Sequence, residues 1–94
     1  MYLYTLEVRI RIYDSFSLKD KRRTVKSILD YSRKNLGVSA AEIGDYDLVN
    51  MARLVFATVS NDNDFSKSIL EKIFKRIEEN YQVEIFEKKL ERLV

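Results

Sequence analysis

The sequence has no cysteine and no histidine, and it has only two glycines among its 94 residues. Without cysteine and histidine, the chain has no disulfide, no thiolate or imidazole catalyst, and none of the usual ligands of zinc and copper. Carboxylates, tyrosines, serines, lysines and arginines are the chemical groups that remain. These absences predict a protein that is not an enzyme and that holds no metal and no cofactor.

Long hydrophobic runs are also missing. No apolar stretch approaches the roughly 20 residues that a membrane-spanning helix needs. Residues 1–13, MYLYTLEVRIRIY, alternate charged and apolar side chains, which is typical of neither a signal peptide nor an anchor. The lack of cysteine also fits a reducing compartment. We therefore expect a cytoplasmic protein with no membrane partner.

The hydrophobic pattern predicts six elements in one domain, residues 1–94, of which 46% are hydrophobic. Residues 18–36 and 62–80 follow the helical period. Strands are predicted within 38–47 and 51–60, with a bulge at Gly44 and a turn near 47–50, and within 81–94. Residues 2–13 alternate with the period of a half-buried strand, whose apolar face holds Tyr4, Leu6, Val8, Ile10 and Ile12.

The order strand, helix, strand, strand, helix, strand predicts an α+β fold. It is the plan of a ferredoxin-like βαββαβ sandwich, in which two helices cover one face of a four-stranded antiparallel sheet. The other face of the sheet would stay open. In the second helix, Asp62 or Asp64 is the expected N-cap, and the apolar stripe is expected to include Phe65, Ile69 and Ile73.

The first predicted helix begins with a concentration of positive charge. Ser17 is expected to cap its N-terminus, Asp20 completes a capping-box pattern, and Gly37 suits a left-handed C-cap. Residues 9–34 hold nine lysines and arginines against three aspartates, although the formal net charge of the chain is only +2. Such clustering attracts phosphate backbones. At 100° per residue, six cations share one solvent face of this helix: Lys19, Arg22, Arg23, Lys26, Arg33 and Lys34.

The other cations of this region have predicted structural roles. Lys21 points near the apolar stripe, where its methylenes would cover apolar surface while the ammonium reaches water. Arg9 and Arg11 lie on the open face of the sheet. We expect them to pair with acidic residues of the last strand, which are Glu84, Glu87 and Glu91.

Three acidic residues near the predicted hairpin could form a hard-metal site in principle. They are Glu42, Asp45 and Asp47. Strand alternation places Glu42 on the face opposite the other two unless Gly44 forms a bulge. We interpret them as solvated hairpin residues.

The motif SLKDKRR, residues 17–23, resembles the Ser-Leu-Lys-acid-Lys-Arg-Arg segment of the small bacterial YlxP-like family, a domain of unknown function. The likeness spans nearly the whole chain. It implies a ferredoxin-like fold and an association with translation, because the family's genes often sit near those for ribosome maturation and initiation factors. Residues 47–52, DLVNMA, depart from the Asp-Leu-Trp-Gln-Arg-Ala that the family tends to carry. Any contribution of that Trp and Arg is therefore not carried over.

Three functions follow from these observations. The first is binding of structured RNA, expected to be ribosomal, by the basic helix face, with an acidic protein surface as the alternative partner. The second is protein interaction, as a homodimer, through the open sheet face, where the third strand would expose either Leu54, Phe56 and Thr58 or Val55, Ala57 and Val59. The third is a small-ligand sensor. Base stacking on the sheet is not expected, because the third strand carries a single aromatic ring.

Overall fold

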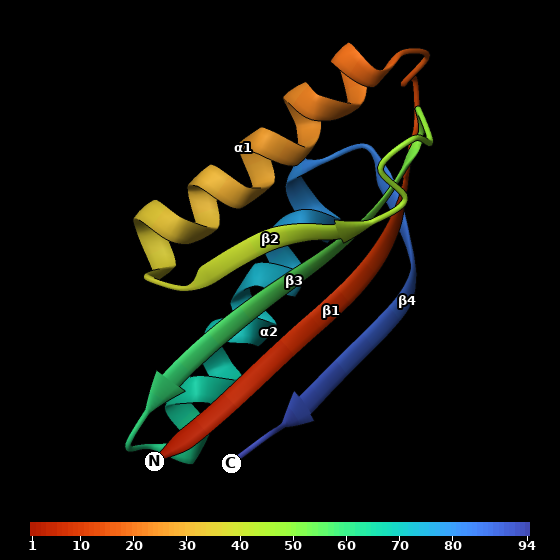
Figure 1. Cartoon of the computed structure of the whole chain (residues 1–94). Coiled ribbons are helices and arrows are strands. Elements are labelled where there is room, and N and C mark those ends of the chain that lie inside the picture. Colours follow the sequence, from red (N-terminus) through yellow and green to blue (C-terminus); the bar gives the residue numbers. More distant parts are fainter.

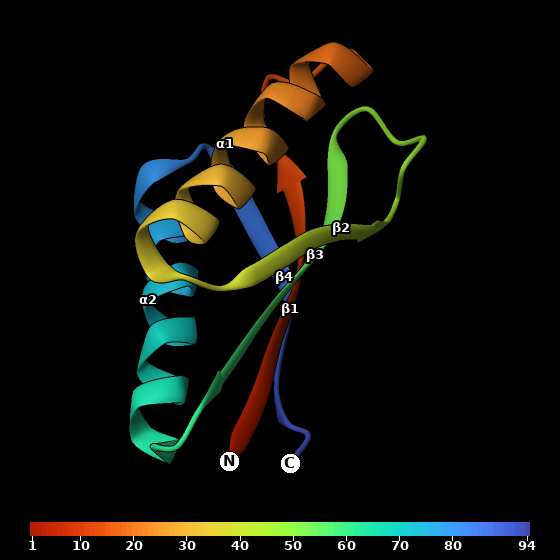
Figure 2. The same cartoon turned by 60° about the vertical axis from the view of Figure 1, so that its left-hand side comes forward.

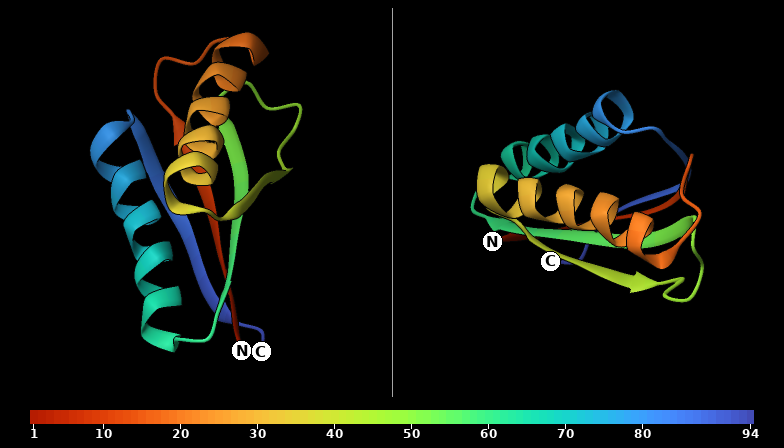
Figure 3. Two further views of the ribbon diagram at one scale, coloured as in Figure 1. Left: turned by 90° about the vertical axis from the view of Figure 1, so that its left-hand side faces the viewer. Right: turned by 90° about the horizontal axis from the view of Figure 1, so that it is seen from above.

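The computed structural model describes residues 1–94. Its elements follow the predicted order: β1 (Tyr2–Ile12), α1 (Leu18–Leu36), β2 (Ser39–Gly44), β3 (Met51–Ser60), α2 (Asn63–Asn80) and β4 (Val83–Arg92). The strands form one antiparallel sheet in the order β2-β3-β1-β4, and both helices cover the same face of it (Figure 1; Figure 3). The prediction of an α+β, ferredoxin-like fold is therefore confirmed.

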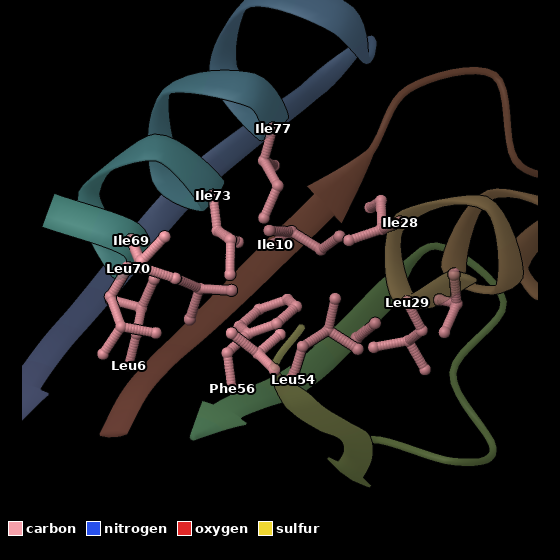
Figure 4. Packing of buried hydrophobic residues seen from close by; sticks show 14 of the residues in the cluster. Leu6, Ile10, Ile28, Leu29, Leu54, Phe56, Ile69, Leu70, Ile73 and Ile77 are labelled. Atoms are coloured by element: carbon pink, nitrogen blue, oxygen red, sulfur yellow. The ribbon is translucent and has the colours of Figure 1, made fainter. Parts of the chain in front are cut away.

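The hydrophobic core lies between the sheet and the helices. Alternation along β1 turns Leu6, Val8 and Ile10 toward the helices, and β3 presents Leu54 and Phe56 beside them; all five side chains are fully buried. Figure 4 shows the helix residues that pack on this face, among which are Ile28, Leu29, Ile69, Leu70, Ile73 and Ile77. Burial of each large apolar side chain contributes about 1.5 to 3 kcal/mol, so this packing fixes α1 over the sheet.

One predicted core position of α2 is wrong. Phe65 lies in the first turn of α2 and is 54% exposed. The neighbouring Ser66 is buried in its place, where its hydroxyl lies 2.5 Å from that of Ser60. Asp62 is the N-cap, because its carboxylate accepts the N–H of Phe65.

Both predicted ends of α1 are confirmed. Ser17 Oγ accepts the N–H of Asp20 at 3.1 Å, and Gly37 has a left-handed φ of 64°. The capping box, however, is not reciprocal, because Asp20 Oδ2 accepts the N–H of Phe16 at 3.1 Å rather than that of Ser17.

Two loops lie together at the end of the molecule where α1 begins, and we call them the apical loops. They are residues 13–17, between β1 and α1, and residues 45–50, between β2 and β3. Ser15 Oγ donates to the carbonyl of Val49 at 2.6 Å and so joins one loop to the other. Figure 1 shows that both chain termini lie at the opposite end of the molecule.

The bulge predicted at Gly44 is confirmed by a shift of the β2–β3 register between Glu42 and Gly44. Because β2 ends at Gly44, the connection to β3 begins at Asp45, which is earlier than the predicted turn near residues 47–50. Neither helix of the fold has the length and apolar character needed to cross a membrane.

Candidate nucleic-acid interface

The predicted cationic surface lies along the side of α1 that faces away from the sheet. We call it the basic face; all six of its residues are exposed: Lys19, Arg22, Arg23, Lys26, Arg33 and Lys34. The helix positions them because residues three and four apart are neighbours on a helix surface, while the buried stripe turns toward the sheet. The basic face is therefore a solvent-facing surface along one side of α1.

Asp30 divides the basic face into two groups. Lys26 Nζ lies 2.7 Å from Asp30 Oδ2, and Arg33 Nη1 lies 3.8 Å from Asp30 Oδ1. The hydrogen bond from Lys26 lowers the pKa of the Asp30 carboxyl below its ordinary value. Arg33 also donates to the backbone carbonyl of Ala40. Two of the six cations are thus engaged within the molecule.

The remaining four cations of the basic face have no carboxylate within 4.0 Å. They are Lys19, Arg22 and Arg23 near the N-terminus of α1 and Lys34 near its C-terminus. Like-charge pairs at this spacing cost a helix about 0.2 to 0.5 kcal/mol each, and cations also oppose the positive end of the helix dipole. The first three therefore weaken the helix that carries them, and no carboxylate of the molecule neutralises their charge.

The predicted placement of the Lys21 ammonium in water is wrong. The Lys21 side chain is only 2% exposed, and Nζ lies 3.1 Å from Glu42 Oε2. Nζ also donates to the carbonyl of Asp45. The ammonium stays inside because β2 and its bulge bring two oxygen partners to the first turns of α1, which removes the need for water.

A second charged cluster occupies the open face of the sheet. Arg9 Nε lies 2.8 Å from Asp45 Oδ2, and Arg53 Nη1 lies 3.1 Å from Glu7 Oε1 and 3.4 Å from Glu87 Oε2. The hydrogen bond from Arg9 lowers the pKa of the Asp45 carboxyl below its ordinary value. These side chains neutralise one another.

The same cluster surrounds a hollow of about 450 Å³ on the open face. Its lining contains no hydrophobic residue, whereas small-molecule sites are lined mainly by apolar side chains. The lining residues are Glu7, Arg9, Arg53, Glu87, Lys88 and Lys89. The hollow therefore lacks the character of a pocket for a small ligand.

The predicted cross-strand pairing is confirmed for two of the three acidic residues. Arg9 lies 3.6 Å from Glu87, and Arg11 lies 3.7 Å from Glu84. Glu91 instead pairs with Lys89, two residues before it in β4, at 3.0 Å. Glu91 lies opposite Thr5 in the β1–β4 register, so neither predicted arginine is within its reach.

The three acidic residues of the hairpin do not gather at one point. Glu42 turns to the helix side and pairs with Lys21, whereas Asp45 lies on the open face and pairs with Arg9. Asp47 is exposed in the apical loop. Each of the first two carboxylates thus has its own cation.

Sequence reasoning missed the aromatic residues of the apical loops. Phe16 is 80% exposed, Tyr46 is 61% exposed and Tyr13 is 53% exposed. A signal for Phe16 was present, because an apolar residue just before an N-cap usually packs on the fourth helical residue. Here that residue is Lys21, which is a poor partner for the ring.

Comparisons with known proteins relate the chain to one family and one fold. The model of the family described as "Protein of unknown function (DUF503)" matches residues 3–89. A crystal structure from Chloroflexus aurantiacus J-10-fl, named provisionally as an antibiotic biosynthesis monooxygenase, has a TM-score of 0.61. The two share 14% sequence identity, over 98% of this chain and 93% of that chain, so the likeness shows the fold alone. No curated protein matches the sequence.

Proposed function

We propose that this chain, which belongs to the DUF503 family, is a non-enzymatic protein that binds structured RNA through its basic face. One observation carries the proposal: Lys19, Arg22 and Arg23 stand together on the solvent side of α1 without any carboxylate within 4.0 Å. The likeness of residues 17–23 to the YlxP-like family supports a ribosomal RNA as the target and the cytoplasm as the location.

The geometry of α1 fits contact with a phosphate backbone. A helix of 19 residues is roughly 28 Å long, and its cations form two groups separated by about 10 Å along the axis. Such a surface meets several phosphates at once. The major groove of an A-form duplex is too deep and narrow for the helix, so we infer contact across the backbone and recognition by shape and charge.

The charged groups outside the basic face support a binding role rather than catalysis. On the open face, every arginine and carboxylate of the Arg9 and Arg53 cluster is already paired within the molecule. A general acid or base needs a group that is free to exchange a proton with a substrate. These ion pairs instead hold neighbouring strands together.

The proposal is tested by co-sedimentation with purified small ribosomal subunits at low salt. In the charge-reversed variant K19E/R22E/R23E, bound protein should fall by at least about tenfold, because each reversal replaces an unpaired cation with a charge that repels phosphate. The fold should survive, since acidic residues suit the first turns of a helix. The matched control, K67E/K72E/K75E, makes the same change in net charge on exposed positions of α2. Equal binding of both variants would contradict the proposal.

A second candidate function is self-association through the open face. The helices cover Leu54 and Phe56, so β3 presents Val55, Ala57 and Val59 to the open side, and Val59 is 60% exposed. A shallow hollow of about 300 Å³ lies beside Val59. A second copy would cover these apolar groups. Light scattering at micromolar concentration should then give the mass of two chains, and the mass of one chain would rule this candidate out.

A further inference from the structure

The exposed aromatic residues of this protein concentrate at the end of the molecule where the basic face begins. Five aromatic side chains are exposed by more than a third, and three of them lie in the apical loops: Tyr13, Phe16 and Tyr46. Leu48 and Val49, in the second apical loop, are also exposed. The other two exposed rings, Phe65 and Phe86, lie in α2 and β4.

The backbone that carries these rings is fixed from several sides. Besides the bond from Ser15 to Val49, the N–H of Ile12 donates to the carbonyl of Asn50 at 2.7 Å. The buried Lys21 ammonium holds the carbonyl of Asp45, the residue before Tyr46. Figure 2 shows the 45–50 loop projecting beside the first turns of α1. The rings therefore project from loops whose backbone is held in place by hydrogen bonds.

Phe16 is the clearest case of a ring without a partner in the chain. It precedes the N-cap, where an apolar side chain usually packs on the fourth helical residue, but that position holds Lys21, whose side chain turns inward. Phe16 consequently leaves 80% of its surface in water.

Phe16 lies next to the unpaired cations at the start of α1. The backbone N–H of Phe16 is bound by Asp20, within the same first turn that carries Lys19, and Arg22 and Arg23 follow in the next turn. An exposed ring beside unneutralised cations suits both parts of an unpaired nucleotide. The base can stack on the ring, and the negative phosphate can contact the cations. An apolar surface rimmed by charge also fits a protein partner, and the test below distinguishes this outcome from RNA binding.

We propose that the apical loops bind unpaired nucleotides of RNA, with bases stacked on Phe16 and Tyr46 and phosphates held by Lys19, Arg22 and Arg23. The inference rests on the proposed function and specifies its substrate as a single-stranded segment, such as a loop or an end. A duplex extending from that segment would meet the rest of the basic face. Stacking is tolerant of sequence, because every base has a flat face.

The test compares two labelled probes, a single-stranded oligouridine and a blunt-ended RNA duplex of the same length, by fluorescence anisotropy. The F16A/Y46A variant should bind the single strand about fivefold more weakly for each ring removed, which corresponds to the lower limit of the stacking free energy per base. It should bind the duplex as tightly as the parent does. Phe65→Ala is the matched control, since it removes a ring of similar exposure in α2. It should change neither affinity.

A direct signal is available because the chain contains no tryptophan. The F16W/Y46A variant should bind the single strand about as tightly as Y46A and more tightly than F16A/Y46A, and a stacked base should quench its indole fluorescence. Unchanged affinity of F16A/Y46A for the single strand, or an equal loss for both probes, would overturn the inference while leaving the proposed function in place. If the parent binds neither probe, both fail. If a protein partner but not RNA quenches the indole fluorescence, the apical loops bind that protein and the inference is wrong.

Discussion

Lys21 Nζ lies 3.1 Å from Glu42 Oε2, in an ion pair that joins the first turns of α1 to the strand β2. The lysine side chain is 2% exposed and the glutamate side chain is 23% exposed. Glu42 Oε2 is buried without a hydrogen-bond partner, so the ammonium is the charge that compensates it. The pair joins β2, the strand that leads into the second apical loop, to the helix that carries the basic face.

Removing either charge of this pair should destabilise the protein, and the two single variants should differ. Glu42→Gln removes the compensating negative charge and leaves the buried Lys21 ammonium with neutral oxygen acceptors only, and the free energy of unfolding should fall by about 3 kcal/mol. Lys21→Met should cost less, about 1 to 2 kcal/mol, because the Glu42 carboxylate that remains is partly in water. Urea denaturation measures both.

The double variant K21M/E42L serves as the control for this pair. Its two apolar side chains leave no buried charge, so it should be more stable than Glu42→Gln. Single variants that each lie within about 0.5 kcal/mol of the parent would show that the pair does not hold α1 on β2.

Acid should weaken the protein partly through Asp45. Because the bond from Arg9 lowers the pKa of this carboxyl below 3.8, folding favours its ionised form. The resulting stability is complete above pH 3.8 and is lost as the pH falls through the lower, folded-state value.

Asp45→Asn removes the charge but keeps a residue that tolerates the positive φ of 60° found there. Its unfolding free energy should lie below that of the parent at neutral pH, and the two should converge as the solution is acidified below pH 3.8. Urea titrations at several pH values measure this difference. A difference that stays constant over the acid range would mean that the pKa of Asp45 is the same in the folded and unfolded states.

The N-cap of α1 should contribute measurably to stability. Ser17→Ala removes the hydroxyl that accepts the N–H of Asp20, and the free energy of unfolding should fall by about 1 kcal/mol. Ser68→Ala provides a comparison, since this serine bonds only to a carbonyl of its own exposed helix turn and its loss should be nearly neutral. Thermal unfolding followed by circular dichroism measures both variants. Equal losses of stability in Ser17→Ala and Ser68→Ala would contradict the role of the Ser17 cap.

The parts of the fold that follow from local periodicity were predictable from the sequence. The buried face of β1 and the basic face of α1 depend only on spacings of two and of three to four residues, which the chain displays directly. The left-handed end at Gly37 and the bulge at Gly44 were signalled by the residue type, because only two glycines interrupt the chain.

The errors arose where a side chain depends on a partner far away in the sequence. Lys21 was expected to reach water, but Glu42 and the Asp45 carbonyl meet it inside the fold. The pairing of Arg9 with Glu87 of β4 was expected, but the shorter contact with Asp45, at 2.8 Å, was not, because it depends on the bulge in β2. No spacing along the chain carries this information.

The central claim, that the basic face binds the phosphate backbone of RNA, is tested most directly by the salt dependence of affinity. If four to six phosphates are neutralised, a plot of log affinity against log salt for a structured RNA hairpin should have a slope of about −3 to −5. The R22Q/R23Q variant removes two of these contacts, so its slope should be shallower by about 1.5 to 2. A parent slope near zero, or the same slope in the variant, would contradict the account.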